Sequence, residues 1–356
     1  MSTTSMASAT TEVTLPGLEA PTATSPKPGH WLERGPQKRL MVFSGSSHPD
    51  LARDIAEKLG VELGEITLKT FANDETYCRY DESIRGADLF LVQTGSAPVD
   101  HHLMELALMI QAAKLASAKR ITAVVPLFPY ARQDRKAKPR EPISARFVAD
   151  MLQLAGADRV LTMDLHAGQI QGFFTIPVDH MTALPLFSRY FRDVGMFGDG
   201  IVSVSPDAGR AKMAVRFAEM LEAEFAIMHK TRPAHDEVAV TEIAGRVRDR
   251  TAILGDDVIH TGGTVLANVR ALKEQGAKAV WIFATHGVFS GDALERFREA
   301  EDIDGVVVTD TVPIDPLRRP ENMTVLPVAQ LLAETIMNVF ADDSVSAIFG
   351  GENQLF

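Results

Sequence analysis

Cysteine is nearly absent from this sequence, because Cys78 is the only one among 356 residues. A disulfide within the chain is therefore impossible, and such cysteine usage is typical of the reducing cytosol. We expect Cys78 to be an ordinary strand residue without chemistry. The sequence also lacks any apolar run near the roughly 18 residues that a membrane-spanning helix needs. These two absences favour a cytoplasmic protein with no membrane partner.

Positive charge is in deficit as well. There are 36 Lys and Arg residues against 47 Asp and Glu residues, which gives a net charge of −11. A nucleic-acid binder needs a basic face, so this balance argues against nucleic acid as a partner, although it allows a local basic pocket. The chain is 46% hydrophobic and 23% charged, the balance of a globular protein, and its length suits two ordinary domains.

The first 37 residues differ from the rest because they are dominated by Ser, Thr, Ala and Pro. Such a segment cannot build a packed core, so residues 1–37 are predicted to be a disordered extension. Transit peptides are also rich in serine, but they are poor in acids. Here Glu12 and Glu19 precede the basic residues Lys27 and Arg34, which favours a cytoplasmic location.

From Arg39 onward, strand-like and helix-like segments alternate, which predicts an α/β fold of mainly parallel sheets flanked by helices. The segments 40–59 and 201–221 look like a weak repeat. We therefore predict two similar domains, 38–182 and 183–340, with a tail, 341–356, that returns to the first domain. The predicted strands are 40–43, 88–94, 120–126, 159–164, 201–204, 224–228, 251–254 and 279–284. The predicted helices are 50–59, 103–113, 144–154, 208–221 and 264–275.

The segment Thr251 to Thr264 carries the most chemical information. A predicted strand end at 252–254 is followed by Asp256 and Asp257, and then by the turn Thr261-Gly262-Gly263-Thr264 before a helical pattern. Two carboxylates at a strand's carboxyl end can accept hydrogen bonds from a vicinal diol. The glycine turn and the helix N-terminus suit a phosphate. A plain strand-turn-helix is the alternative, but the combination favours a ribose 5-phosphate group.

Two further strand ends carry candidate ligands. Asp207, in the turn Ser205 to Arg210, could hold a metal ion or a ribose hydroxyl, or could simply cap a helix. His166 follows another strand and is a candidate for the magnesium region or for a nucleotide contact. Magnesium prefers oxygen ligands, so a structural role for His166 is the alternative.

Cations gather in two segments. The first follows a buried strand and suits a polyphosphate, although a solvated loop is the alternative. It contains Arg132, Arg135, Lys136, Lys138 and Arg140. The second contains Lys230 and Arg232, which end a strand before a polar loop. These two could close over a transferring phosphoryl group or lie on a plain exposed loop.

In their order, the motifs resemble the ribose-phosphate pyrophosphokinase family, from about residue 39 to the end of the chain. DLHAGQIQGFF and YARQDRK are the specific ones, since phosphoribosyltransferases lack them. The full set comprises Phe71-Ala72-Asn73-Asp74-Glu75, Ser83-Ile84-Arg85-Gly86, YARQDRK from Tyr130, REPISA from Arg140, DLHAGQIQGFF from Asp164, SPDAGR from Ser205, HKTR from His229, DDVIHTGGT from Asp256 and SVS from Ser344. The forms HKTR and SPDAGR look most like the phosphate-activated bacterial class.

The resemblance implies two phosphoribosyltransferase type I-like domains and a transferase reaction. The anomeric hydroxyl of ribose 5-phosphate attacks the β-phosphorus of ATP bound with Mg²⁺, giving phosphoribosyl pyrophosphate and AMP. It also implies a hexamer built from dimers, with phosphate and ADP as effectors. These are the family's usual partners, and none of them is a nucleic acid or a membrane.

The resemblance also assigns roles to residues. Lys230 and Arg232 stabilise the transition state, and His166 and Asp207 match the magnesium region. The ATP site matches Phe71, Asn73 and Glu75, which come from a neighbouring subunit, and Arg132, Gln133 and His166. The ribose 5-phosphate site matches Asp207, Asp256, Asp257, His260, Thr261, Gly262, Gly263 and Thr264. The regulatory phosphate or ADP site between subunits matches Ser83, Arg85, Ser344 and Ser346.

Three departures from the family pattern bear on the site. His260 stands where the synthetases usually carry Asp. It either supports ribose 5-phosphate binding, more so at mildly acidic pH, or is tolerated, or impairs the site. Gly255 replaces a larger apolar residue, which is expected to loosen the strand end. Arg210 replaces a Gly of many relatives.

Two rival functions stay open. A phosphoribosyltransferase would release pyrophosphate in a nucleobase-dependent reaction without ATP. A non-catalytic regulatory subunit would lack the loop cations or the double acid, which this chain keeps.

Overall fold

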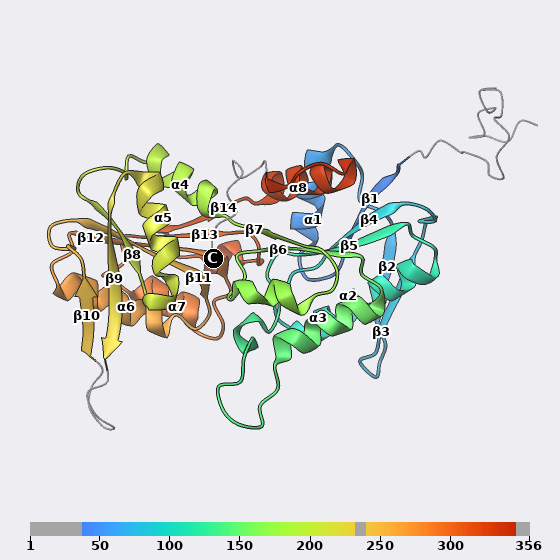
Figure 1. The fold of residues 1–356 in the computed structure, drawn as a ribbon, viewed down its shortest axis with the longest axis horizontal. Helices are drawn as coiled ribbons and strands as arrows, with labels where there is room; N and C mark the ends of the chain where they lie inside the picture. The colour runs from blue at the N-terminus through green and yellow to red at the C-terminus, as the bar shows by residue number, and fades with distance from the viewer. Residues whose placement is uncertain (1–37, 232–239, 347–356) are drawn as a thin grey trace, which may run out of the picture. The chain divides into compact units, whose positions relative to one another are not determined.

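The computed structural model describes residues 38–231 and 240–346, which form one compact unit from Lys38 on (Figure 1). The predicted extension at 1–37 lies outside the described residues, as do Arg232 and the end of the predicted tail. Strands and helices alternate and most strand pairs are parallel, so the predicted α/β class is confirmed. Along the described ranges, no helix combines the length and apolar character required to cross a membrane.

The first sheet has five parallel strands in the order β1-β4-β5-β6-β7. Its interior strand β4 is buried along its whole length, as expected for a sheet covered on both faces. The strands are β1 (Leu40–Ser44), β4 (Asp88–Val92), β5 (Arg120–Val125), β6 (Arg159–Met163) and β7 (Val178–Met181). The helices in this part are α1 (Pro49–Leu59), α2 (Val99–Leu115) and α3 (Ser144–Ala155), with the 3-10 turns η1 (Ala131–Gln133) and η2 (Gly168–Phe173).

A separate antiparallel hairpin, β2 (Ile66–Thr70) with β3 (Thr76–Tyr80), was not predicted from the alternation pattern. Cys78 lies in β3, half-buried and free, as expected. Burial raises the pKa of the Cys78 thiol to about 11, so the thiol stays protonated at neutral pH.

The second sheet has seven strands in the order β10-β9-β8-β11-β12-β13-β14, and only β10 runs antiparallel to its neighbour. The chain builds outward from β8 to β9 on one side and then returns to add β11 on the other. This reversal is a topological switch point, where α/β sheets usually bind ligands beyond the carboxyl ends of strands. The strands are β8 (Ile201–Ser205), β9 (Glu224–Thr231), β10 (Val240–Ala244), β11 (Thr251–Ile259), β12 (Ala279–Gly287), β13 (Gly305–Thr309) and β14 (Met323–Leu326).

Helices cover both faces of this sheet, and one apolar core continues from it into the first sheet. That core joins Phe90 of β4 with Phe283 of β12, beneath helices α1, α4, α5 and α8. Helix α8 packs against α1, as Figure 1 shows in red beside blue. The helices are α4 (Leu184–Asp193), α5 (Ala211–Leu221), α6 (Gly263–Glu274), α7 (Ala293–Glu299) and α8 (Ala329–Ala341), with 3-10 turns η3 (Ala208–Arg210) and η4 (Pro316–Arg318). The sheets divide between β7 and β8, but the shared core leaves the predicted boundary at residue 182 a prediction.

Strand β11 is longer than predicted, which corrects the placement of the acid pair. Its ladder with β8 ends at Leu254 opposite Val204, but its ladder with β12 continues to Ile259 opposite Gly287. Asp256 and Asp257 therefore lie within β11 rather than after it. They project beyond the end of β8 because only one neighbour continues to pair with β11.

Candidate active site

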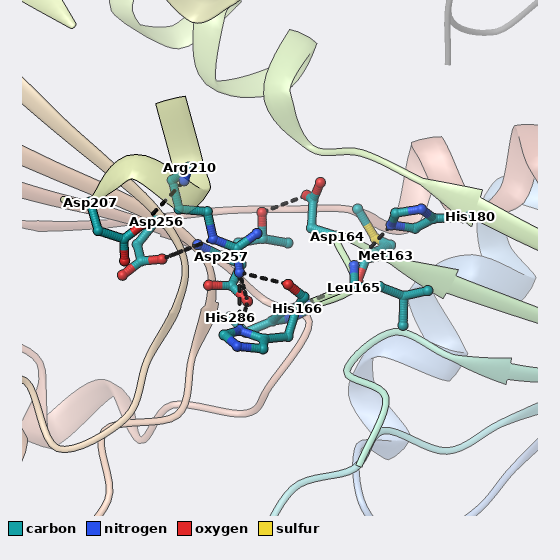
Figure 2. A network of polar contacts seen from close by, with 11 residues as sticks. Met163, Asp164, Leu165, His166, His180, Asp207, Arg210, Asp256, Asp257 and His286 are labelled. Carbon is teal, nitrogen blue, oxygen red and sulfur yellow. Dashed lines mark hydrogen bonds and ion pairs between the residues drawn. The ribbon is translucent and has the colours of Figure 1, made fainter. Parts of the chain in front are cut away.

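Three strand ends converge at the switch point of the second sheet. Asp207 follows β8, and His166 is on the turn that follows β6 of the first sheet. Asp256 and Asp257 lie on the part of β11 that no longer pairs with β8. Figure 2 shows these side chains pointing toward one another, with Arg210 reaching in from η3. The structure thus brings together residues that lie about ninety positions apart in the sequence, as with His166 and Asp257, which are 91 residues apart.

Asp257 is the centre of this cluster, and its side chain is only 5% exposed. Its Oδ2 lies 2.8 Å from Nδ1 of His166 and 2.5 Å from Nη2 of Arg210. An ionised carboxylate only accepts hydrogen bonds, so the contact with Asp257 favours the tautomer with the proton on Nδ1 of His166, even though Nη2 of Arg210 also lies 3.0 Å from this nitrogen. The other ring nitrogen, Nε2, is then an unprotonated acceptor when the imidazole is neutral.

The surroundings shift the pKa values of Asp256 and Asp257 in opposite directions. Burial opposes ionisation of Asp257, but the hydrogen bond from His166, the contact with Asp256 and the charge of Arg210 together lower its pKa. Burial, followed by the neighbouring Asp257, raises the pKa of Asp256 well above its usual value. Two adjacent buried carboxylates cannot both ionise cheaply, so a cation beside them matters.

Arg210 supplies that cation, and the sequence analysis noted it only as a departure from the family pattern. Its Nη2 also donates to the carbonyl oxygen of His166 at 3.1 Å, and its Nε lies 3.7 Å from Oδ1 of Asp256. The backbone N–H of Arg210 donates to Oδ1 of Asp207 at 3.1 Å. The helix-cap alternative for Asp207 is therefore observed in part, because one of its oxygens caps η3.

The turn that presents His166 is held by residues that the sequence analysis missed. Asp164 has a positive φ of 35°, and its Oδ2 accepts hydrogen bonds from Thr285 Oγ1 at 2.6 Å and Ala183 N at 2.8 Å. The backbone N–H of Leu165 donates to Nε2 of His180 at 2.8 Å. Burial lowers the pKa of His180 to about 4, so this acceptor stays neutral. The aspartate of the DLH motif was the available signal for this turn.

His286 completes the support of this turn. It is buried, and its Nε2 lies 3.0 Å from the carbonyl oxygen of Met163 and its Nδ1 2.9 Å from Oγ1 of Thr311. Because a carbonyl oxygen only accepts, Nε2 carries the proton. His286 is therefore tied to the last residue of β6, directly before the turn.

A cavity of about 690 Å³ borders the cluster. Its lining contains Arg132, Gln133, His166, Asp257 and His260, all predicted to contact substrates. Arg132 and Gln133 lie on η1, where Oε1 of Gln133 accepts a hydrogen bond from Oγ of Ser144 at 2.7 Å. Phe128, Pro129 and Tyr130 add apolar surface, so the cavity offers a cationic and an apolar part, which suits a nucleotide.

The predicted phosphate loop follows β11 directly. Gly262 has a φ of +74°, and a Cβ added there would lie 2.4 Å from Cε2 of Phe297, so both conformation and space require glycine. Helix α6 begins at Gly263, and Thr261 and Thr264 are exposed beside its N-terminus. Free amides and a helix dipole at this position favour an anion.

Other predicted residues are not gathered into this cavity within one chain. Phe71 and Glu75 line a groove of about 770 Å³ that shares Pro98, Asp100 and His101 with the main cavity. Oδ1 of Asn73 accepts a hydrogen bond from the backbone N–H of Glu75 at 3.4 Å, so it lies on the same hairpin turn. The prediction that these three residues serve a neighbouring subunit stays a prediction.

The predicted loop cations are only partly described. Lys230 lies near the end of β9, where its backbone pairs with Thr241 of β10. Strand β9 ends at Thr231, and Arg232 lies outside the described residues. Their catalytic role stays a prediction.

The predicted regulatory residues lie in two places. Ser344 and Ser346 border a pocket of about 350 Å³ together with Arg159 and Asp179, and their hydroxyl oxygens are 2.8 Å apart. Ser83 is exposed, as is Arg85, and the Ser83 carbonyl oxygen accepts a hydrogen bond from Arg39. A shared site between subunits stays a prediction for these residues.

The structure bears on two departures from the family pattern. Gly255 does not loosen its strand, because it is buried, paired with Phe283 on β12, and packed under that residue's ring. For His260, partial burial and the positive charge of Arg132 lower the pKa below its usual value. The lowered pKa makes a positive charge on His260 less favourable at mildly acidic pH, and its role in ribose 5-phosphate binding stays a prediction.

The residues present fit a magnesium ion that is shared with phosphates. Among residues 38–231 and 240–346, no three His, Cys, Asp or Glu side chains converge as a ready-made metal cage. Magnesium does not need one, because it usually takes one or two carboxylates, several waters and substrate phosphates. Asp207 is exposed and keeps one oxygen outside its cap, which suits such a site.

Comparisons with known proteins agree on one family. Residues 40–156 match the family model for the N-terminal domain of ribose phosphate pyrophosphokinase, and residues 234–350 match the phosphoribosyl synthetase-associated domain. Ribose-phosphate pyrophosphokinase of Corynebacterium efficiens is 48% identical, covering 91% of this chain and 99% of that protein. The protein of that name from Clostridium acetobutylicum is 47% identical, covering 88% and 98%.

A solved structure is similar over the same range. The crystal structure of phosphoribosylpyrophosphate synthetase from Mycobacterium smegmatis has a TM-score of 0.80 and 47% sequence identity to this chain. The match covers 86% of this chain and 100% of the other. The likeness therefore extends through both sheets and is not confined to the ribose-phosphate motif.

Proposed function

The chain belongs to the ribose-phosphate pyrophosphokinase family, and we propose on this basis how its residues divide the work of the reaction. The enzyme transfers the β,γ-diphosphoryl group of ATP to the anomeric hydroxyl of ribose 5-phosphate. The anomeric oxygen bonds to the β-phosphorus, the bond between that phosphorus and the oxygen bridging to the α-phosphate breaks, and AMP leaves. The hydroxyl proton is released to solvent.

One observation supports the proposed positions of ATP and ribose 5-phosphate. His166 lines the large cavity and at the same time hydrogen bonds to Asp257 of the acid pair. ATP placed in the cavity against Arg132 and Gln133 would thus lie beside a sugar held by the acid pair. Such proximity of two substrates accounts for much of the rate in transfer reactions.

The sugar site uses the acid pair and the loop after it. Asp256 and Asp257 accept hydrogen bonds from the two ribose hydroxyls, and Asp207 borders them at the end of β8. The 5-phosphate binds at the N-terminus of α6, against Thr261, Gly262, Gly263 and Thr264. His260 follows β11 directly and lines the large cavity together with Arg132.

A divalent metal fits between the two substrates. Mg²⁺ held by Asp207 and by Nε2 of His166, together with substrate phosphates, would neutralise phosphate charge. Lys230 and Arg232 at the β9–β10 connection would supply further positive charge to the transferring group.

Assembly and regulation complete the proposal. Phe71, Asn73 and Glu75 contact the base of an ATP molecule bound by a neighbouring subunit in a hexamer. Ser83, Arg85, Ser344 and Ser346 form a site between subunits at which phosphate activates and ADP inhibits. The exposed position of Arg85 leaves its charge free for such an anion.

The deciding assay supplies purified protein with ATP, magnesium and ribose 5-phosphate. AMP should form, and label in the γ-phosphate of ATP should appear in the sugar product. Formation of ADP, with one labelled phosphate on the sugar, would instead indicate an ordinary kinase. If no combination of ATP, magnesium and ribose 5-phosphate yields AMP, the regulatory-subunit alternative is favoured. Nucleobase-dependent release of pyrophosphate without ATP would favour a phosphoribosyltransferase.

A further inference from the structure

Arg210 is a cationic residue of the cluster in Figure 2 to which the proposed reaction gives no role. Its guanidinium lies 2.5 Å from Oδ2 of Asp257 and 3.7 Å from Oδ1 of Asp256, and it also contacts the carbonyl oxygen and Nδ1 of His166 at 3.1 and 3.0 Å. Its own backbone N–H is fixed by Asp207. With a side chain only 17% exposed, Arg210 is a positioned cation rather than a solvated one.

The contacts of Arg210 leave room for a sugar on the acid pair. A carboxylate has two oxygens and about four lone-pair sites. Arg210 and His166 both reach Oδ2 of Asp257, on the side of the turn that follows β6. Oδ1 of Asp257 and the carboxylate of Asp256 thus keep acceptor capacity for hydroxyl donors. Arg210 can remain in place while a diol binds.

The positive charge of Arg210 offsets the negative charges that surround it. Asp207, Asp256 and Asp257 lie close together, and ribose 5-phosphate brings a phosphate dianion beside them. Like charges in a partly buried site repel strongly, because water screens them poorly there. Among the described residues, Arg210 is the basic side chain that the structure pairs with this acid cluster, with ion pairs to both members of the acid pair.

We propose that Arg210 is the fixed counter-cation of the acid pair and that it sets the affinity of this site for anionic sugar phosphate. It acts through Asp257 and Asp256, which makes it a positioning residue. The inference rests on the proposed ribose 5-phosphate site and extends it, because it names what allows two carboxylates to accept from a sugar that carries a phosphate. A cation at this position also keeps the carboxylates aligned for the diol.

The test compares Arg210→Ala and Arg210→Lys with Lys212→Ala, in the AMP-forming assay. Lys212 is an exposed cation on the same helical segment and forms no ion pair in the described structure, so its loss controls for net charge. Arg210→Ala should raise KM for ribose 5-phosphate about tenfold, the effect of a charged hydrogen bond. KM for ATP should stay within about twofold. Arg210→Lys should be intermediate, since one ammonium cannot reach both partners with the same geometry.

Added guanidinium or methylguanidine should lower KM for ribose 5-phosphate in the Arg210→Ala variant, but not in the wild type or in the other variants. A merely structural role would not give this rescue, nor a loss confined to one substrate. An unchanged or lower KM for ribose 5-phosphate in Arg210→Ala would overturn the inference, and a lower one would mean that Arg210 competes with the sugar. If the unmodified protein forms no AMP, the proposed function itself fails. An active wild type with unaffected Arg210 variants rejects only the role of Arg210.

Discussion

Gly255 and Phe283 lie opposite each other on β11 and β12, and the ring of Phe283 occupies the space that a side chain at position 255 would need. A Cβ built on Gly255 would lie 2.3 Å from Cζ of that ring. Phe283 in turn packs against Phe187 and Phe217 in tilted contacts, with ring centroids 4.8 and 4.4 Å away. The residue directly before the acid pair is thus small because an aromatic core lies against it.

We expect Gly255→Ala to destabilise the protein by about 1–3 kcal/mol, since overpacking forces Phe283 and its neighbours to shift. Thermal unfolding should show a lower Tm. Gly172→Ala is the matched control, because an added Cβ there meets nothing within 4 Å and the residue is exposed. A Tm unchanged in both variants would show that the aromatic cluster yields without cost.

Asp310 should make stability depend on pH. Burial raises its pKa to about 6, and its Oδ1 accepts a hydrogen bond from Val328 N at 2.8 Å. Between about pH 4 and pH 6 the folded state then binds more protons at this site than the unfolded state, so its stability falls as pH rises. The loss across this window is about 2–3 kcal/mol.

Asp310→Asn keeps the acceptor oxygen and removes the titration. The variant should gain Tm relative to wild type at pH 7.5 and gain less at pH 4.5. Asp302→Asn, at an exposed position, serves as the control for lost charge. An equal change in Tm at both pH values would show that Asp310 does not titrate in this window.

The sequence allows the chemistry of the site to be predicted better than its geometry. Strand and helix alternation and the glycine turn follow from local periodicity and turn conformation, so Gly262 was predicted in its local setting. Asp256 and Asp257 were predicted as candidates but were placed after the strand rather than within it. The reach of Arg210 to His166 was not predicted, because this contact joins residues 44 positions apart across two sheets. Nor could local pattern show that β12 extends β11 past Leu254, since strand length there is set by a partner strand.

The turn at Asp164 was hidden from sequence reasoning for a related reason. His180 and Thr285, which hydrogen bond to this turn, come from strands of different sheets. No sequence pattern near Asp164 indicates either contact. The β2–β3 hairpin was not predicted because its strands are half-buried rather than fully apolar. Tertiary contacts decide both features, and a single sequence reports such contacts only weakly.

The loop cations provide a kinetic prediction. Lys230→Ala and Arg232→Ala should each lower kcat by roughly 10²-fold or more, because each removes positive charge aimed at the transferring group. KM should change less, since a transition-state contact affects turnover more than ground-state binding. Lys278→Ala, at an exposed position before β12, is the control. A change confined to KM would assign these cations to ATP binding alone.

The regulatory proposal can be tested through Arg85. Inorganic phosphate should activate the wild type, and Arg85→Ala should shift this activation to phosphate concentrations about tenfold higher, since a charged hydrogen bond to the anion is lost. Activity as a function of phosphate, at fixed substrates, gives the comparison. Arg79→Ala, which removes an exposed cation already paired with Asp81, is the control. A wild-type phosphate response in Arg85→Ala would show that the anchor is assigned wrongly.

His260 is the remaining departure at the sugar site, and the structure narrows its role. Because partial burial and the charge of Arg132 lower its pKa, His260 is protonated less readily than an ordinary imidazole. We expect His260→Gln to leave KM for ribose 5-phosphate within about threefold of wild type between pH 6.5 and 8, with the same pH profile, because a neutral donor replaces a neutral donor.

His260→Asp restores the residue usual in the family and tests the other possibilities. Its carboxylate would lie near Arg132 and near the 5-phosphate, so attraction to one opposes repulsion from the other. We expect KM for ribose 5-phosphate to rise by about threefold or less, with kcat nearly unchanged. A large gain in kcat at every pH would mean that His260 impairs the native enzyme. A steep fall of KM below pH 7 in the wild type, absent in His260→Gln, would mean that the imidazole is charged there after all.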